Sequence, residues 1–277
     1  MSYIRVQACN LGNQMFRYML AVYLGNRLPG FEICGCNMPE WGLVDVIDRP
    51  DWQAPFRLPY GHKVDIDGAL RGVAPGGGHD GLNIDAFAQR MEYFGHDLDR
   101  FRRIFHSDET GTPVGDDEIV VNVRTGDILA GIHPDYYPLP LDVYRHILNV
   151  TGLRPVFVGQ VEAGNWYTDA LRAAFPSGRF VGGQGALADF QTVRHARHKI
   201  IAISTFSWLA AWLSKDDAVI HYPVAGFLNP VQRGDVDLLP IDDPRYRLHL
   251  FPVHRYTASP EDQAAMTEGI WDIAFGF

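Results

Sequence analysis

The sequence predicts an α/β protein built from two domains. Its 277 residues, at roughly 150 residues per domain, correspond to about two domains. From about residue 116 onward, short apolar runs rich in β-branched residues alternate with segments of helical periodicity, a pattern typical of parallel sheets covered by helices on both faces. The polar segment 108–117, which contains Gly and Pro, predicts a linker. We therefore expect an N-terminal domain over 1–115, a C-terminal domain over 116–258 and a C-terminal helix over 259–277.

The N-terminal domain is less regular in its spacing than the C-terminal domain. Residues 48–82 are rich in Pro, Gly and Asp, so we expect loops with short elements there. Residues 83–105 place apolar side chains at helical spacing, which predicts a helix. The other elements expected here are a strand over Tyr3–Ala8, a helix over 13–28 and a strand over Phe31–Cys34.

The C-terminal domain is expected to form a parallel sheet. Its predicted strands are Glu118–Val123, Pro155–Gly159, Arg179–Val181, Lys199–Ile203 and Ala218–Tyr222. Its predicted helices are Leu141–Val150, Trp166–Phe175, Ala186–Arg197 and Phe206–Leu213. The final helix begins at Ser259, a residue type that caps helices, with Pro260 in its first turn.

Composition and charge argue against a general nucleic-acid binder and against a disulfide-based scaffold. Lysine plus arginine number 24 and aspartate plus glutamate 33, a formal charge of −9, which argues against a general nucleic-acid binder. A phosphate-bearing ligand must therefore be bound by a local site rather than by the overall field. The three cysteines, Cys9, Cys34 and Cys36, lack the spacing of a disulfide framework.

The N-terminal segment shows no signal-peptide pattern, since no basic stretch precedes an apolar run. The longest apolar stretch, Ile200–Leu213, is interrupted by hydroxyl side chains and is shorter than the roughly 18–20 residues that span a bilayer. We expect a cytoplasmic protein without an integral membrane segment, and peripheral association with a membrane stays open.

Three segments at predicted strand ends carry residues suited to binding phosphate. In open α/β sheets, ligands bind at the carboxyl ends of strands, where helix N-termini present unpaired N–H groups to anions. In the first segment Gly12 permits a tight turn, and Asn13 either caps the following helix or contacts a ligand. In the third segment, the hydroxyl residues Ser204 and Thr205 precede an apolar helix. Their hydroxyls either cap this helix or bind a diphosphate.

The second segment places Arg124 directly after a buried strand, with Gly126 and Asp127 following. A guanidinium binds phosphate oxygens in a bidentate manner, and a neighbouring carboxylate holds it in place. The alternative is a purely structural ion pair between Arg124 and Asp127. Together the three segments predict a nucleotide-sugar site between the domains, because a departing pyrophosphate needs cationic and N–H stabilisation.

The same segments resemble a known family. Residues 11–18, LGNQMFRY, resemble the opening L-G-N-Q-M-F-Q-Y motif of the alpha-1,2-fucosyltransferases, glycosyltransferase family eleven. Asn122–Asp127 resembles the H-x-R-x-G-D motif of the wider fucosyltransferase superfamily. Residues 200–213 are similar to its I-I-A-N-S-T-F-S-W-W-A-A-W-L segment. The three matches occur in the family's order along most of the chain.

This resemblance implies an inverting, metal-independent glycosyltransferase of GT-B type, with two facing Rossmann-like domains. The implied donor is GDP-fucose, the acceptor is a glycan hydroxyl in alpha-1,2 linkage, and no cofactor is expected. Polysaccharide biosynthesis is the implied setting. By resemblance Arg124 contacts the β-phosphate, and Asp189 accepts hydrogen bonds from guanine. The remaining implied donor contacts are Gly12, Asn13, Ser204, Thr205 and Phe206.

Several positions depart from the family pattern. Asn122 stands where the family has histidine, and Leu209 where it has a second tryptophan. Cys9-Asn10 replaces Gly-Gly, and Gly159-Gln160-Val161 replaces Ser-Asp-Asp. These changes leave two alternatives open: a different nucleotide-sugar donor, or a non-catalytic glycan- or nucleotide-binding module.

Transfer with inversion calls for a carboxylate or imidazole near the acceptor hydroxyl. Asp127, His133 and Asp135 are the candidates, alongside a route driven by GDP departure with weak base assistance. Three D-x-D triplets are expected by chance in an acidic chain and do not predict a metal site. The aromatic residues Trp41, Trp52 and Tyr60 either stack on acceptor sugars or pack in the core.

Overall fold

The computed structural model describes residues 2–45 and 53–276. The chain divides into two compact units: unit 1 comprises Met1–Ser107 and Asp235–Leu238, and unit 2 comprises Asp108–Gly234 and Leu239–Phe277. Unit 2 therefore includes both the segment expected to be a linker and the C-terminal helix. The four residues 235–238 return to unit 1, a feature that the sequence did not predict.

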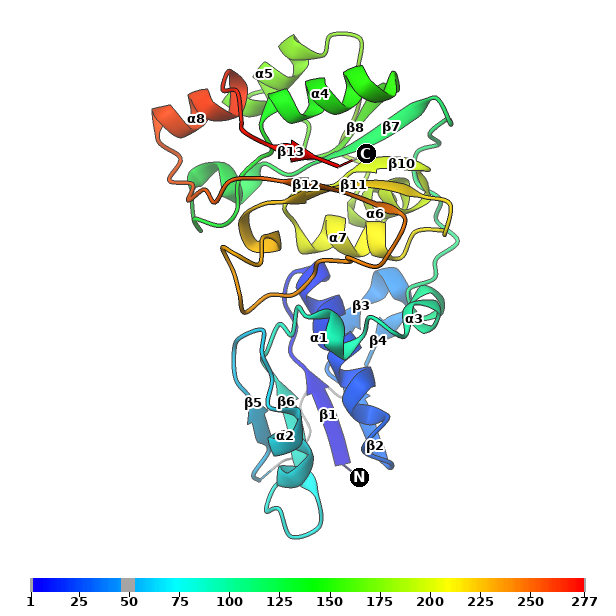
Figure 1. Cartoon of the computed structure of the whole chain (residues 1–277). Helices are drawn as coiled ribbons and strands as arrows, with labels where there is room; N and C mark the ends of the chain where they lie inside the picture. Colours follow the sequence, from blue (N-terminus) through cyan, green and yellow to red (C-terminus); the bar gives the residue numbers. More distant parts are fainter. Residues whose placement is uncertain (1, 46–52, 277) are drawn as a thin grey trace. The chain divides into compact units, whose positions relative to one another are not determined.

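Unit 1 contains a four-stranded parallel sheet in the order β2-β1-β6-β5 (Figure 1). Its strands are β1 (Ser2–Val6), β2 (Phe31–Cys34), β5 (Phe56–Leu58) and β6 (Gly81–Ile84), and a short hairpin pairs β3 (Asn37–Met38) with β4 (Leu43–Val44). Its helices are α1 (Leu11–Gly25), α2 (Ile66–Val73) and α3 (Leu98–Ile104), with 3-10 turns at Pro39–Trp41 and Met91–Tyr93. Helix α1 packs on β1 and β2 through a largely buried apolar face.

The prediction of a single helix over 83–105 is wrong. The segment begins inside β6, passes through the 3-10 turn and reaches a helix only at Leu98. Ala88 has a φ of 50°, a left-handed backbone that interrupts any helix. All four residues of β6 are buried, so its apolar side chains fill a sheet core rather than one helix face. The loops with short elements expected over 48–82 are found from residue 53 onward, where the short elements are β5 and α2, the latter capped by Asp65.

Unit 2 contains a seven-stranded sheet in the order β13-β12-β11-β10-β7-β8-β9. Its strands are β7 (Glu118–Val123), β8 (Arg154–Gly159), β9 (Arg179–Val181), β10 (His198–Ile200), β11 (Val219–Val224), β12 (Tyr246–Leu250) and β13 (Ala274–Phe275). All pairs are parallel except β12 with β13. From β9 to β12 the strands follow the 3-2-1-4-5-6 order of the doubly wound Rossmann sheet.

Helices cover both faces of the sheet of unit 2 (Figure 1). One face carries α4 (Leu141–Thr151), α5 (Trp166–Ala174) and α8 (Pro260–Thr267), and the other carries α6 (Ala186–His195) and α7 (Thr205–Trp212). Two 3-10 turns lie at Gly126–Ala130 and Gly226–Leu228. The prediction of an α/β fold with parallel sheets is confirmed, as is the cap of α8, where Ser259 accepts a hydrogen bond from the Asp262 amide.

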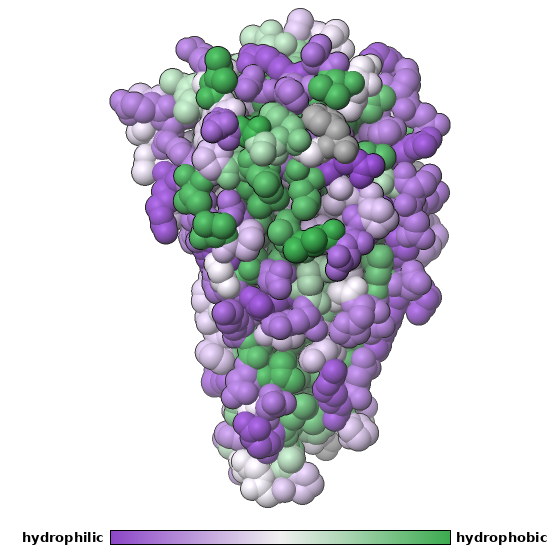
Figure 2. All heavy atoms as spheres, viewed as in Figure 1, coloured by the Kyte–Doolittle hydropathy of each residue, from purple (hydrophilic) through white to green (hydrophobic). Residues whose placement is uncertain are grey.

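The core of unit 2 lies between sheet and helices. Trp208 and Trp212 of α7 are stacked and buried, and β7 is buried from Ile119 onward. Figure 2 shows hydrophilic residues over much of the viewed face, with hydrophobic ones between them. Within residues 2–45 and 53–276, no helix has the length and apolar character needed to cross a membrane.

Candidate functional site

In the sheet of unit 2, the order in which the chain adds strands reverses between β7 and β10. The chain runs outward from β7 to β8 and β9, returns to β10 beside β7, and then runs outward to β11 and β12. The parallel register pairs Ile200 with Val121, so the carboxyl ends of β7 and β10 lie side by side. In open α/β sheets this switch point is where ligands bind. The Arg124 segment follows β7 and the Ser204 segment follows β10, so both lie at one edge.

Arg124 is held in place but remains partly accessible. Its Nη2 atom lies 3.1 Å from each carboxylate oxygen of Asp127. Its guanidinium lies 5.7 Å from the ring centroid of Tyr136, which stacks on Phe227 at 4.7 Å. The side chain of Arg124 is 27% exposed. The ion pair and an anion-binding role are therefore compatible, because the carboxylate and the ring orient a cation that solvent still reaches.

The turn after β7 is supported by Gln160, a residue that the sequence did not identify as functional. The Thr125 amide donates to Oε1 of Gln160 at 2.8 Å, and the Thr125 hydroxyl donates to the Gln160 carbonyl at 3.2 Å. Gly159 precedes it with a φ of 107°, and a Cβ there would lie 2.6 Å from the Val123 carbonyl oxygen. Only glycine allows β8 to end this close to β7. Asn122 is buried and donates to the Val158 carbonyl at 3.3 Å.

Helix α7 begins at the end of the segment after β10. Ser204 is its N-cap residue, but its side chain makes no capping hydrogen bond. The nearby Ser207 hydroxyl instead accepts from the Ala202 amide at 3.0 Å. Ser204 and Thr205 are buried, and Phe206 is half-buried. Among the described residues, therefore, no side chain caps the N–H groups in the first turn of α7, the arrangement that favours anions.

Asp189 lies in the first turn of α6, the helix that packs against α7. Its Oδ1 accepts from Nε2 of Gln184 at 2.9 Å. Burial raises the pKa of the Asp189 carboxyl, the Gln184 hydrogen bond opposes this shift, and nearby Glu162 adds to it. The next residue, Phe190, meets Phe206 edge to face at 5.2 Å. This ring contact places Asp189 on the element adjacent to the α7 N-terminus.

The three candidate bases differ in environment. Asp135 is 3% exposed, and its carboxylate accepts from Nε2 of Gln232 at 2.7 Å and from Nη1 of Arg233 at 3.1 Å. These contacts occupy both of its oxygens and favour a structural role over proton transfer. The side chains of Asp127 and His133 are 47% and 44% exposed, with His133 Nδ1 3.8 Å from an Asp135 oxygen.

In unit 1, the two residues expected to contact the nucleotide-sugar donor lie in the first turn of helix α1. Gly12 is buried and Asn13 is half-buried, at the second and third positions of the helix. The Oδ1 atom of Asn13 accepts from Nε2 of Gln89 at 3.0 Å. The sequence gave no signal for Gln89, because it lies in the segment expected to be helical.

The three aromatic candidates of unit 1 have different outcomes. Trp41 is 7% exposed and meets Phe105 edge to face, so it belongs to the core. Tyr60 is 74% exposed beside Phe87 and remains accessible to a sugar. Trp52 lies outside the described residues.

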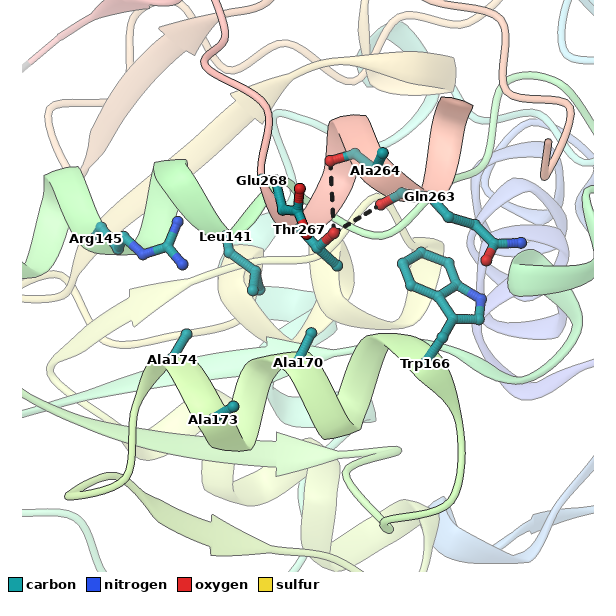
Figure 3. Close-up of a pocket in the computed structure, with 10 residues that line it drawn as sticks. All are labelled: Leu141, Arg145, Trp166, Ala170, Ala173, Ala174, Gln263, Ala264, Thr267 and Glu268. Atoms are coloured by element: carbon teal, nitrogen blue, oxygen red, sulfur yellow. Dashed lines mark hydrogen bonds between the residues drawn. The ribbon is translucent and has the colours of Figure 1, made fainter. Parts of the chain in front are cut away.

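Two further features lie away from the strand ends. Helices α4, α5 and α8 line a groove of about 480 Å³, floored by alanines and bordered by Trp166, Arg145 and Glu268 (Figure 3).

Among the residues that the structure describes, no group of three or more His, Cys, Asp or Glu side chains could hold a metal ion. The D-x-D triplet at 235–237 instead lies beside Arg90, which is 3.7 Å from a carboxylate oxygen of Asp237.

The topology of unit 2 and the residues at its switch point define an α/β domain with an anion-suited edge. No protein-family model matches the chain, and no curated protein or solved structure matches it significantly.

Proposed function

We propose that the protein is an inverting, metal-independent glycosyltransferase that transfers fucose from GDP-fucose to a glycan hydroxyl. One observation carries this proposal: Arg124 and the uncapped N-terminus of α7 lie at the same switch point. A cation and a set of N–H groups at one edge are what a departing diphosphate requires. The alpha-1,2 linkage and the facing GT-B arrangement of the two units are part of the proposal through the family resemblance.

In this proposal, each group at the edge has a distinct role. Arg124 binds the β-phosphate, and Asp127 and Tyr136 keep its guanidinium oriented. Ser204 and Thr205 present hydroxyls and helix N–H groups to the diphosphate. Asp189 accepts hydrogen bonds from the guanine base.

The proton of the acceptor hydroxyl passes to Asp127 or His133, the two exposed candidates. The C–O bond from fucose to the acceptor forms as the bond to GDP breaks, and GDP carries away the bonding electron pair. Exposed Tyr60 supplies an aromatic surface for a sugar in unit 1.

The decisive experiment measures GDP release from GDP-fucose by the purified protein, with an oligosaccharide acceptor and EDTA present. We expect turnover that EDTA does not abolish. Calorimetric titration with GDP and with UDP, in parallel, tests which nucleobase the protein binds. Tight binding of UDP alone would replace GDP-fucose with another nucleotide-sugar donor.

The strongest competing proposal is a glycosyltransferase that uses a different nucleotide-sugar donor in place of GDP-fucose. Gln160 and Asn122 stand where the resembling family has other residues, and both are engaged in contacts within the sheet edge. GDP binding without any sugar transfer would instead favour a non-catalytic binding module. Absence of binding to either nucleotide would remove the glycosyltransferase proposal altogether.

A further inference from the structure

Gln89 is a buried amide with one defined contact in unit 1. Its side chain is 1% exposed, and its Nε2 atom donates to Oδ1 of Asn13 at 3.0 Å. Its Oε1 atom has no hydrogen-bond partner among residues 2–45 and 53–276. A buried amide that is only half satisfied costs stability.

The backbone around Gln89 is fixed from both sides. Ala88, immediately before it, is fully buried with a φ of 50°, a conformation that costs energy for a residue with a Cβ. The segment 235–238 lies along the other side, where the Asp237 amide donates to the Gln89 carbonyl at 3.0 Å. The Met91 amide in turn donates to the Asp237 carbonyl at 2.8 Å. These bonds hold Gln89 where its side chain reaches Asn13.

The contact determines which end of the Asn13 carboxamide is presented to a ligand. A carboxamide has an acceptor on one branch and two donors on the other. Because Gln89 donates to Oδ1, the acceptor branch faces Gln89, and Nδ2 is the branch left for a ligand. No described residue accepts a hydrogen bond from Nδ2, and Asn13 is half-buried. An NH2 group at the start of α1 suits a phosphate or sugar oxygen.

We propose that Gln89 is a positioning residue that orients Asn13 as a hydrogen-bond donor to the nucleotide-sugar. The inference rests on the proposed function, in which Asn13 contacts the donor. Gln89 does not touch the ligand itself, since its amide is buried. Without Gln89, the Asn13 carboxamide is free to rotate and to present its oxygen, which repels the oxygens of a phosphate.

The test is a double-mutant cycle with Asn13→Ala and Gln89→Leu. Leucine is close in size to glutamine and removes both polar atoms of the amide, and Gln89→Met, with an unbranched side chain, is the second variant if Gln89→Leu fails to fold. GDP affinity by calorimetry and kcat/KM for GDP-fucose are measured for all four proteins. We expect Gln89→Leu to weaken both by about 2- to 10-fold, the effect of losing one neutral hydrogen bond. In the Asn13→Ala background the same substitution should change them by less than about 2-fold.

A matched control is Gln191→Leu, a buried glutamine in unit 2 that does not contact Asn13. Its effect should be the same with and without Asn13→Ala. Equal effects of Gln89→Leu in both backgrounds, or no effect in either, would overturn the positioning role. If the wild-type protein binds neither GDP nor GDP-fucose, the proposed function is wrong as well. Binding by the wild type therefore separates a failure of the positioning role of Gln89 from a failure of the proposed function.

Discussion

At the carboxyl end of β7, Arg124 is the side chain best suited to bind phosphate. Arg124 combines a carboxylate partner, an aromatic neighbour and residual exposure. The sequence predicted the residue and its neighbour Asp127, because an arginine leaving a buried strand is unexplained by packing. It did not predict Tyr136 or Gln160, since their contacts join segments that are distant in sequence.

Replacing Arg124 with Ala should lower kcat/KM for GDP-fucose by at least about tenfold, as expected for one charge-assisted contact of about 1.5–3 kcal/mol. Steady-state kinetics measure this change. Arg154→Ala is the matched control, because Arg154 is exposed and pairs with Asp117 in another part of unit 2. Kinetics close to wild type for Arg124→Ala would return the residue to a structural ion pair.

Gln191 of α6 shows the opposite situation, a polar side chain without a visible use. It is fully buried, and neither Nε2 nor Oε1 has a hydrogen-bond partner among the described residues. Gln191→Leu should therefore raise the free energy of unfolding by about 1 kcal/mol, measured by urea denaturation. Asn122→Leu is the comparison, since it removes a buried amide that does donate to Val158 and should destabilise the protein. A loss of stability in Gln191→Leu would show that this amide is satisfied in solution.

At the scale of elements, the pairing of β11 with β12 brings two histidines into the core. His221 and His249 are both buried, with Nδ1 of the first 2.9 Å from Nε2 of the second and their rings stacked. Burial, together with the smaller electrostatic effect of its neighbour His249, lowers the pKa of His221 to about 3. Burial also lowers the pKa of His249 to about 4, with His146 adding to the shift. The sequence did not predict β12 because its residues alternate between apolar and polar and form no continuous apolar run, and the alternation does not match the burial, since His249 is buried and Leu250 is exposed.

This pair predicts a loss of stability in mild acid. Both histidines stay neutral in the folded protein, whereas unfolded histidine takes up a proton below pH 6.5. The unfolded state therefore binds more protons between pH 6.5 and about 4. The free energy of unfolding should fall by about 1.4 kcal/mol per pH unit for each histidine as the pH is lowered through that range. Urea denaturation at a series of pH values measures the slope.

The comparison variant is His249→Gln, in which the side chain at position 249 no longer titrates and His221 is kept. Its slope should be roughly half that of the wild type over the same pH range. A wild-type stability that does not change between pH 6.5 and 4 would show that the pair is not held neutral in solution.

At the scale of the whole chain, a formal charge of −9 coexists with a site proposed for a dianionic diphosphate. The attraction is local, because one arginine and one helix N-terminus meet at a strand edge. The chain also returns to unit 1 at 235–238, where Asp237 bonds to Gln89. That return was beyond sequence reasoning, since a four-residue segment carries no periodicity of its own.

The sequence by itself determined the α/β class, the strands of unit 2 from β7 to β11 and the two strand-end segments with Arg124 and Ser204. These are recorded locally, in alternation, apolar runs and the residues that follow them. Only the tertiary structure decided the strand order, which makes β7 and β10 neighbours, and the contacts of Gln89, Gln160 and Asp135. The reason is physical: strand order and buried hydrogen bonds depend on which distant segments pack together, and single-sequence periodicity does not encode that pairing.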